Sequence, residues 1–117
     1  MKCSDALLPL GALAHESRLE VFRLLVRRGP EGYSPGALIQ KLGIPAPTLS
    51  FHLKELQQAG LIDVRREGRF LFYSADFDRI NALVAFLTAN CCSLGSATSG
   101  TNCVPAVASL PRQRKRA

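Results

Sequence analysis

Apolar residues recur every three or four positions along most of the chain, and this period predicts amphipathic helices. The clearest case lies in the middle of the sequence, where Leu49, Leu53 and Leu56 fall on one face of a helix. Pro47 suits the first turn of this helix, and Gly60 suits its end because glycine readily forms a left-handed cap. The same period predicts earlier helices over residues 5–15, 16–28 and 35–42.

The third predicted helix is followed closely by the helix with the leucine stripe. Ser34 can cap the third helix, and Pro35 suits its first turn. Gly43 stops it, and residues 44–46 form the short link to the next helix. Two helices joined this tightly are typical of a helix-turn-helix.

In the helix with the leucine stripe, the face opposite the leucines carries short hydrogen-bonding groups, one aromatic ring and one cation. Such a face can enter the major groove of DNA. The alternative is an ordinary amphipathic surface helix, and for His52 it is partial packing inside the fold. The residues predicted to contact DNA from this helix are Thr48, Ser50, His52 and Lys54.

After Gly60 the pattern changes to one that favours strands. Two runs rich in β-branched and aromatic residues, 61–64 and 70–74, flank a charged turn that contains Gly68, and this predicts a β-hairpin. A hairpin directly after a helix-turn-helix is a wing, and its arginines are expected to contact phosphates or the minor groove. The alternative is solubilising charge on an exposed tip. The arginines are Arg65, Arg66 and Arg69.

A last helix is predicted from Asp76 or Asp78 onward, and it carries very little charge after Arg79. A small domain cannot bury so apolar a helix by itself, which predicts a homodimer. The residues of the last helix expected in the dimer interface are Ile80, Leu83, Val84 and Leu87.

The predicted fold class is therefore α+β and mainly α: a winged helix-turn-helix with a two-stranded β-hairpin wing, paired into a homodimer. Residues 1–92 are expected to form the DNA-binding and dimerisation domain. Residues 93–117 change in composition to Gly, Ser, Thr, Ala and Pro, and are expected to be a flexible segment that carries Cys103 and a basic tail.

Charge and composition say less about function than the pattern of helices and strands does. Of the net charge of +6, four charges belong to residues 112–116, so the overall charge says little about the folded body. No apolar run is long enough to cross a membrane, and the start of the chain lacks the features of a signal peptide, so a cytoplasmic location and no membrane partner are expected. The sequence shows no nucleophile with a partnering base, no phosphate-binding glycine loop and no paired carboxylates, so an enzyme is not expected.

Four segments resemble the ArsR/SmtB family of winged-helix metalloregulators, and the resemblance spans roughly residues 7–90. It implies a homodimeric repressor that pairs through its first and last helices, which adds Leu7 and Leu10 to the expected dimer interface. Such a repressor binds an inverted-repeat operator and releases it when a metal or metalloid binds. In family members that match residues 50–53, this helix reads DNA. The matching segments are AHESRLEVFRLL (14–25), TLSFHLKEL (48–56), AGLI (59–62) and GRFLFY (68–73).

The family places its sensor sites in different positions. Residues 40–50 contain no cysteine, so the thiol motif at the recognition helix is absent, and neither histidine lies on the last helix, so the zinc-type site is absent too. The remaining candidates are Cys91, Cys92 and Cys103, which resemble the C-terminal three-cysteine site of the arsenite-responsive branch.

Three thiolates without a histidine suit As(III) or Sb(III), because thiolates select soft ions and structural zinc takes four ligands. Side chains of neighbouring helical residues diverge by about 100°, so the helix must end or distort for Cys91 and Cys92 to share one atom. Two alternatives stay open: a redox disulfide between Cys103 and either neighbour, and sensing of Zn(II), Cd(II) or Pb(II), with Cys3 or water as a further ligand. DNA binding itself is expected to need no cofactor.

Overall fold

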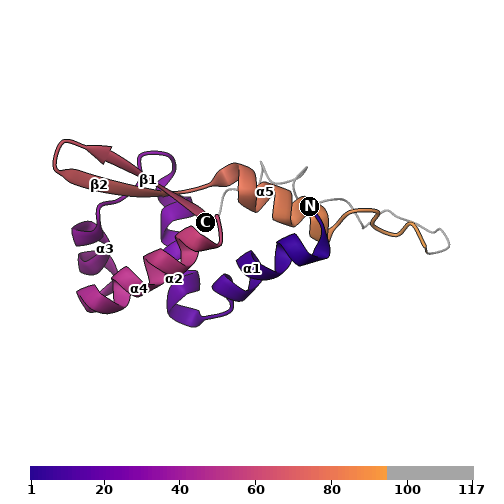
Figure 1. The fold of residues 1–117 in the computed structure, drawn as a ribbon, viewed down its shortest axis with the longest axis horizontal. Coiled ribbons are helices and arrows are strands. Elements are labelled where there is room, and N and C mark those ends of the chain that lie inside the picture. Colours follow the sequence, from indigo (N-terminus) through magenta and orange to yellow (C-terminus); the bar gives the residue numbers. More distant parts are fainter. Residues whose placement is uncertain (95–117) are drawn as a thin grey trace.

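The computed structural model describes residues 1–94, which form helices and one antiparallel β-hairpin (Figure 1). This arrangement is a winged helix-turn-helix and confirms the predicted fold class. In chain order the elements are α1 (Cys3–Leu13), α2 (Glu16–Arg28), α3 (Pro35–Leu42), α4 (Ala46–Gln58), β1 (Ile62–Glu67), β2 (Phe70–Ala75) and α5 (Phe77–Leu87).

The predicted bounds of α2 and α3 are confirmed, and those of α1 are shifted. The helix α1 begins at Cys3 rather than at Asp5, whose carboxylate accepts a hydrogen bond from the backbone N–H of Lys2 at 3.0 Å. It also ends two residues before His15. That residue instead caps α2, where its Nδ1 accepts from the backbone N–H of Arg18 at 3.4 Å.

The end of α4 is fixed by Gly60, as the sequence predicts. Gly60 has a φ of 78° and donates its N–H to the carbonyl of Gln57 at 3.0 Å. The next N–H, of Leu61, reaches the carbonyl of Leu56 at 3.0 Å. These two bonds form a Schellman motif, which satisfies the last carbonyls of the helix and turns the chain into β1.

The core is built around the leucine stripe of α4, which packs against α2 and α3 and the base of the hairpin. Each fully buried leucine contributes roughly 1.5–3 kcal/mol relative to an exposed one. Burial of the stripe therefore fixes the rotation of α4 and leaves its other side outside the core. The buried side chains are Ala12, Val21, Phe22, Leu25, Leu38, Leu49, Leu53, Leu56, Ala59, Leu61, Ile62 and Ala75.

The turn of the wing is shorter than the sequence predicts. The predicted turn over residues 65–69 shortens to Gly68 and Arg69, because Gly68 adopts a φ of 64° and closes the hairpin directly. Arg65 and Arg66 consequently belong to β1, where Arg65 lies opposite Phe72 on β2.

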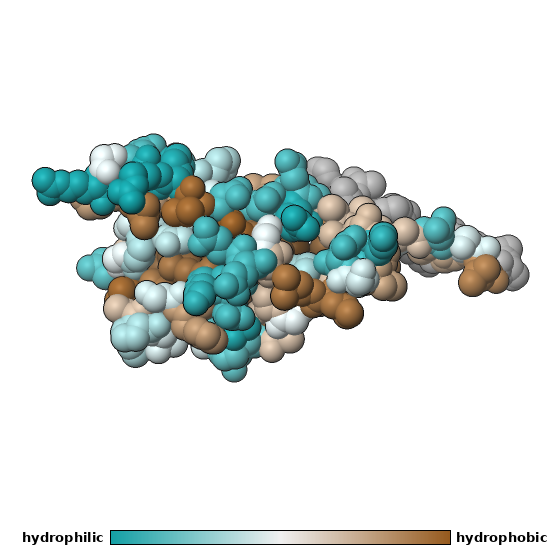
Figure 2. Space-filling model, in the orientation of Figure 1, coloured by the Kyte–Doolittle hydropathy of each residue, from teal (hydrophilic) through white to brown (hydrophobic). Residues whose placement is uncertain are grey.

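The last helix begins where expected, since the Asp76 carboxylate caps it by accepting from the Arg79 N–H at 3.0 Å. Apolar side chains stay exposed in the middle of α1 and at the end of α5: Leu7 is 67% exposed, Leu8 60% and Leu87 56%. Brown side chains gather over α1 in Figure 2. Within residues 1–94, no helix has both the length and the apolar character needed to cross a lipid bilayer.

The loop after α2 offers a test of the fold. Gly32 has a φ of 72°, and a Cβ there would overlap the backbone carbonyl oxygen of Tyr73 on β2. Gly32→Ala should lower the free energy of unfolding by about 2–4 kcal/mol, measured by urea denaturation. Gly43→Ala is the matched control: its φ is 68° but no atom lies within 4 Å, so only the backbone cost of about 1–2 kcal/mol applies. Equal losses in the two variants would contradict the steric argument.

Candidate nucleic-acid interface

The outward face of α4 presents the polar groups that the sequence singled out. Thr48, Ser50 and Lys54 are exposed, while the leucine stripe on the other side is buried. Phe51, which is 53% exposed, lies on the same helix as a large apolar surface open to solvent. Hydroxyls, a cation and an aromatic ring on one exposed helix can contact phosphates, base edges and a thymine methyl group.

His52 does not belong to this face, and its prediction as a DNA-contacting residue is wrong. The side chain is 4% exposed and lies on the buried side of α4. It follows Leu49 by three positions and precedes Leu56 by four, and residues at this spacing share a helix face. The alternative of a packed histidine is the one that the structure supports.

The partner of His52 is Arg18 on α2, which the sequence pattern does not reveal. Arg18 donates from Nε to Nδ1 of His52 at 3.4 Å and from Nη1 to the carbonyl of Ala12 at 3.2 Å. Its guanidinium also lies 5.7 Å from the centre of the Phe51 ring. Arg18 therefore ties α4 to the junction between α1 and α2.

The surroundings of His52 oppose its protonation. Burial is the largest cause that lowers its pKa below 6.5, followed by the nearby His15 and the Arg18 guanidinium. The ring centres of His15 and His52 are 4.8 Å apart. The neutral imidazole fits this site because its Nδ1 must accept the hydrogen bond from Arg18.

Two of the three wing arginines are available for a ligand. Arg66 and Arg69 are exposed, and neither side chain has a hydrogen bond or ion pair in the part of the chain that the structure describes. They lie at or beside the turn between β1 and β2.

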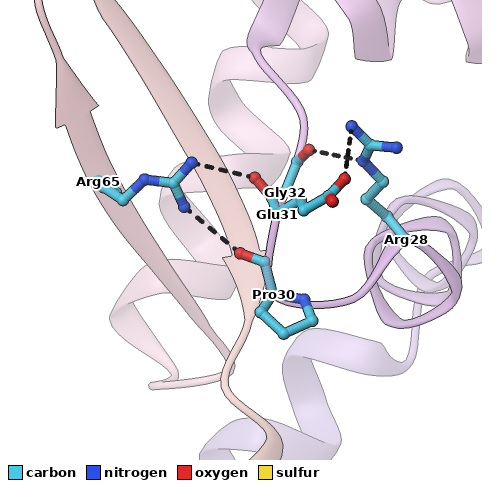
Figure 3. Close-up of polar contacts among 5 residues, drawn as sticks. All are labelled: Arg28, Pro30, Glu31, Gly32 and Arg65. Carbon is cyan, nitrogen blue, oxygen red and sulfur yellow. Dashed lines mark hydrogen bonds and ion pairs between the residues drawn. The ribbon is translucent and has the colours of Figure 1, made fainter.

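Arg65 differs from them, because its guanidinium is engaged with the protein itself (Figure 3). Nη1 donates to the carbonyl of Pro30 at 3.4 Å, and Nη2 to that of Glu31 at 3.3 Å. Nε donates to the Glu67 carboxylate at 2.8 Å. Its N–H groups are thus directed at the loop after α2 and at Glu67, and the contact of Arg65 with DNA stays a prediction.

Comparison with known proteins agrees with this arrangement. Residues 13–65 match the family model of a helix-turn-helix domain. The chain is 35% identical over 92 residues to the biofilm growth-associated repressor of Agrobacterium fabrum, and the match covers 79% of this chain and 76% of the repressor.

Solved structures give the same result. An ArsR-like transcriptional regulator from Rhodococcus sp. RHA1 aligns with a TM-score of 0.65 and 26% identity, over 72% of this chain and 76% of that one. The chain belongs to the ArsR/SmtB-like family of winged helix-turn-helix transcriptional regulators. A homodimeric winged helix-turn-helix DNA-binding domain from Mycobacterium bovis, a possible ArsR-family regulator, aligns with a TM-score of 0.58 and 25% identity over 82% of this chain and 89% of that one.

In this ArsR-like regulator the two adjacent cysteines follow α5 rather than lying on it. The helix ends at Leu87, and Asn90 and Cys92 adopt left-handed φ values of 58° and 65°. Both cysteines are exposed, and the Sγ atoms of Cys91 and Cys92 are 3.5 Å apart. Cys103 lies outside the described residues, so the three-sulfur site remains a prediction.

The residues predicted for the dimer interface divide into two groups. Leu7, Leu10 and Leu87 are exposed, and Ile80 and Val84 are partly so. Leu83 is 2% exposed within the single chain, because it lies on the inner face of α5. Leu83 therefore offers almost no surface to a partner, which corrects its assignment.

The buried histidine makes stability depend on pH. Because the pKa of His52 is lowered below 6.5 on folding, the unfolded chain binds the proton more readily. The free energy of unfolding should fall as the pH drops from about 7 through the lowered pKa of His52, and it should not fall further below that pKa on account of this group. Urea denaturation at several pH values measures this dependence.

Two variants test whether His52 or His15 causes the pH dependence of stability. His52→Gln should show a smaller loss of stability between neutral and acidic pH, since glutamine does not titrate. His15→Ser keeps an acceptor for the α2 cap and should retain most of the pH dependence of the unmodified chain. A dependence unchanged in His52→Gln would show that other groups cause it.

Proposed function

We propose that this ArsR-like regulator is a metalloid-responsive repressor. A homodimer would bind an inverted-repeat operator and dissociate when Cys91, Cys92 and Cys103 bind As(III) or Sb(III). The observation that carries the proposal is the pair of exposed cysteine sulfurs directly after α5, whose Sγ atoms lie 3.5 Å apart.

The DNA-binding half of the proposal is supported by the family and by the exposed face of α4. Thr48 and Ser50 are assigned to base edges or nearby phosphates, and Lys54 to a phosphate. Arg66 and Arg69 are assigned to the DNA backbone from the wing. The relative from Agrobacterium fabrum is a repressor.

The homodimer is supported by the apolar surface that a single chain leaves uncovered. Leu7 and Leu87 are among the most exposed large apolar residues of the described part of the chain. The similar domain from Mycobacterium bovis is homodimeric. Pairing through α1 and α5 would cover these side chains and place the two α4 helices of the dimer at a fixed spacing.

The sensing half rests on the chemistry of the cysteine pair. A metal–thiolate bond is about 2.3 Å long for zinc, and two sulfurs of one ion lie less than twice a bond length apart. The distance of 3.5 Å between the Sγ atoms of Cys91 and Cys92 allows both to reach one ion. A third thiolate from Cys103 would complete the three-sulfur set that a soft trivalent metalloid prefers.

Coupling would pass through α5. Cys91 follows this helix by four residues, and Phe77 and Ile80 pack the start of the helix against the core. If Cys91, Cys92 and Cys103 bound one ion, the conformation at the end of α5 would change at the dimer surface. The spacing of the two α4 helices would change with it. Operator and metalloid would then weaken each other by the same factor, typically worth ~1–3 kcal/mol.

The same adjacent cysteines also support a second candidate signal. Exposed sulfurs at 3.5 Å could respond to thiol oxidation, or to Zn(II), Cd(II) or Pb(II), and the DNA-binding half of the proposal would be unchanged. A titration with each ion under reducing conditions, followed by one with an oxidant, separates these signals.

Serine variants test the sensor. Cys91→Ser, Cys92→Ser and Cys103→Ser should each bind the promoter DNA of the regulator normally but no longer release it with arsenite, because each removes one of three ligands. Mobility shifts titrated with arsenite under reducing conditions measure this, and Cys3→Ser is the matched control that should still respond. Release of the triple variant at the wild-type arsenite concentration would place the site elsewhere.

A wing variant tests the role of Arg66 in DNA binding. Arg66→Ala should weaken binding to all sequences alike and reduce the slope of log affinity against log salt by about one, because the alanine side chain cannot bind a phosphate. Fluorescence anisotropy at several salt concentrations measures both quantities. A weakening restricted to the operator sequence would instead assign Arg66 to base recognition.

A further inference from the structure

The tip of the wing projects from the body, and only β2 packs against α2 and α3 nearer the base. Ile62 at the base of β1 is 2% exposed, whereas the next five residues of the strand are exposed. A two-stranded hairpin has no rigid orientation of its own unless something holds it. The direction in which the wing tip points must therefore be fixed by contacts near its base.

Figure 3 shows such a contact, which we name the wing brace: Arg65 on β1, the loop residues Pro30, Glu31 and Gly32, and Arg28 at the end of α2. From the wing side, the guanidinium of Arg65 reaches the carbonyls of Pro30 and Glu31 at 3.4 and 3.3 Å. The cation also lies 5.1 Å from the centre of the Phe72 ring on β2, so both strands of the wing hold it.

The loop is held from the opposite side by Arg28. Its Nε donates to the carbonyl of Gly32 at 3.0 Å, and its Nη2 lies 3.1 Å from the Glu31 carboxylate. Arg28 also stacks against the Tyr33 ring, with 4.8 Å from the guanidinium carbon to the ring centre. The loop is thus fastened to α2, which belongs to the core.

The backbone completes the connection. Tyr33 and Tyr73 exchange two hydrogen bonds of 2.9 Å, so the end of the loop pairs with β2. The loop therefore meets the wing at two places: at β2 through backbone bonds, and at β1 through Arg65. Two separate attachments prevent the hairpin from rotating about either one.

We propose that Arg65 is a positioning residue for DNA binding, which sets the angle of the wing so that Arg66 and Arg69 reach the DNA backbone. The proposal rests on the proposed DNA contacts of the wing tip. The ion pair of Arg65 with Glu67 adds little stability, because the two side chains are 44% and 58% exposed. The geometric constraint is the main effect of Arg65, since one planar guanidinium spans two neighbouring carbonyls.

A lysine variant separates position from charge. Arg65→Lys keeps the positive charge but cannot donate to Pro30, Glu31 and Glu67 in one plane. If Arg65 positions the wing, Arg65→Lys should weaken operator binding by about tenfold or more at 0.1 M salt and lower the salt slope by roughly 0.9 for each phosphate that the tip no longer reaches. Arg23→Lys is the matched control: Arg23 is exposed on α2 and its side chain makes no hydrogen bond or ion pair within residues 1–94, so this variant should keep the wild-type affinity and slope.

A double-mutant cycle makes the test specific. Arg66→Ala should reduce the affinity of the unmodified regulator, but it should have much less effect in the Arg65→Lys background, where the tip no longer reaches DNA. Full additivity of the two effects, or wild-type affinity and slope for Arg65→Lys, would overturn the proposal. No effect of Arg66→Ala in the unmodified regulator would overturn the wing contact itself, and with it the assignment of Arg65.

Folding of the variants is checked by thermal unfolding. Should Arg65→Lys fail to fold, Arg28→Lys releases the same loop from the α2 side while leaving Arg65 and the charge in place. Its operator affinity and salt slope should fall in the same direction as those expected for Arg65→Lys. A folded Arg28→Lys variant with wild-type affinity and slope would show that the brace does not set the wing.

Discussion

Burial of the leucine stripe of α4 is the constraint on which the other features depend. Leu49, Leu53 and Leu56 are 1%, 4% and 0% exposed, so the helix has one possible rotation in the core. That rotation decides which residues can face a ligand. It brings Thr48, Ser50 and Lys54 to the outside and takes His52 inside, although all four are polar and lie within seven positions.

The exposed face of α4 does not act alone, because the elements around it are tied to the same core. Arg18 connects α4 with the α1–α2 junction, and the loop after α2 connects with the wing. A displacement of α2 would therefore move both the helix that is proposed to read DNA and the hairpin beside it. At the other end of the molecule, Cys91 and Cys92 follow α5, which carries exposed apolar surface.

Most of the fold could be predicted from the sequence, because the signals are local. The Ser34–Pro35 start of α3, the Gly60 cap of α4 and the Asp76 cap of α5 each act within four residues. The exceptions are contacts between distant parts of the chain. Arg18 lies 34 positions from His52, and Arg65 lies 35 positions from Pro30, so no local pattern reveals either pair. The helical spacing of His52 from Leu49 and Leu56 was the one signal that could have placed it inside.

The loop contacts of Arg65 have a consequence for how the sequence can vary. Both loop acceptors are main-chain oxygens, of Pro30 and Glu31, and every residue type supplies such an oxygen. Substitutions at these two positions that preserve the loop's path leave the acceptors intact, whereas the donor is a single side chain. In a chimera that carries this hairpin on a related protein, Arg65 must be kept as part of the hairpin. The loop of the recipient protein needs only a backbone path that presents the two carbonyl oxygens, whatever its side chains.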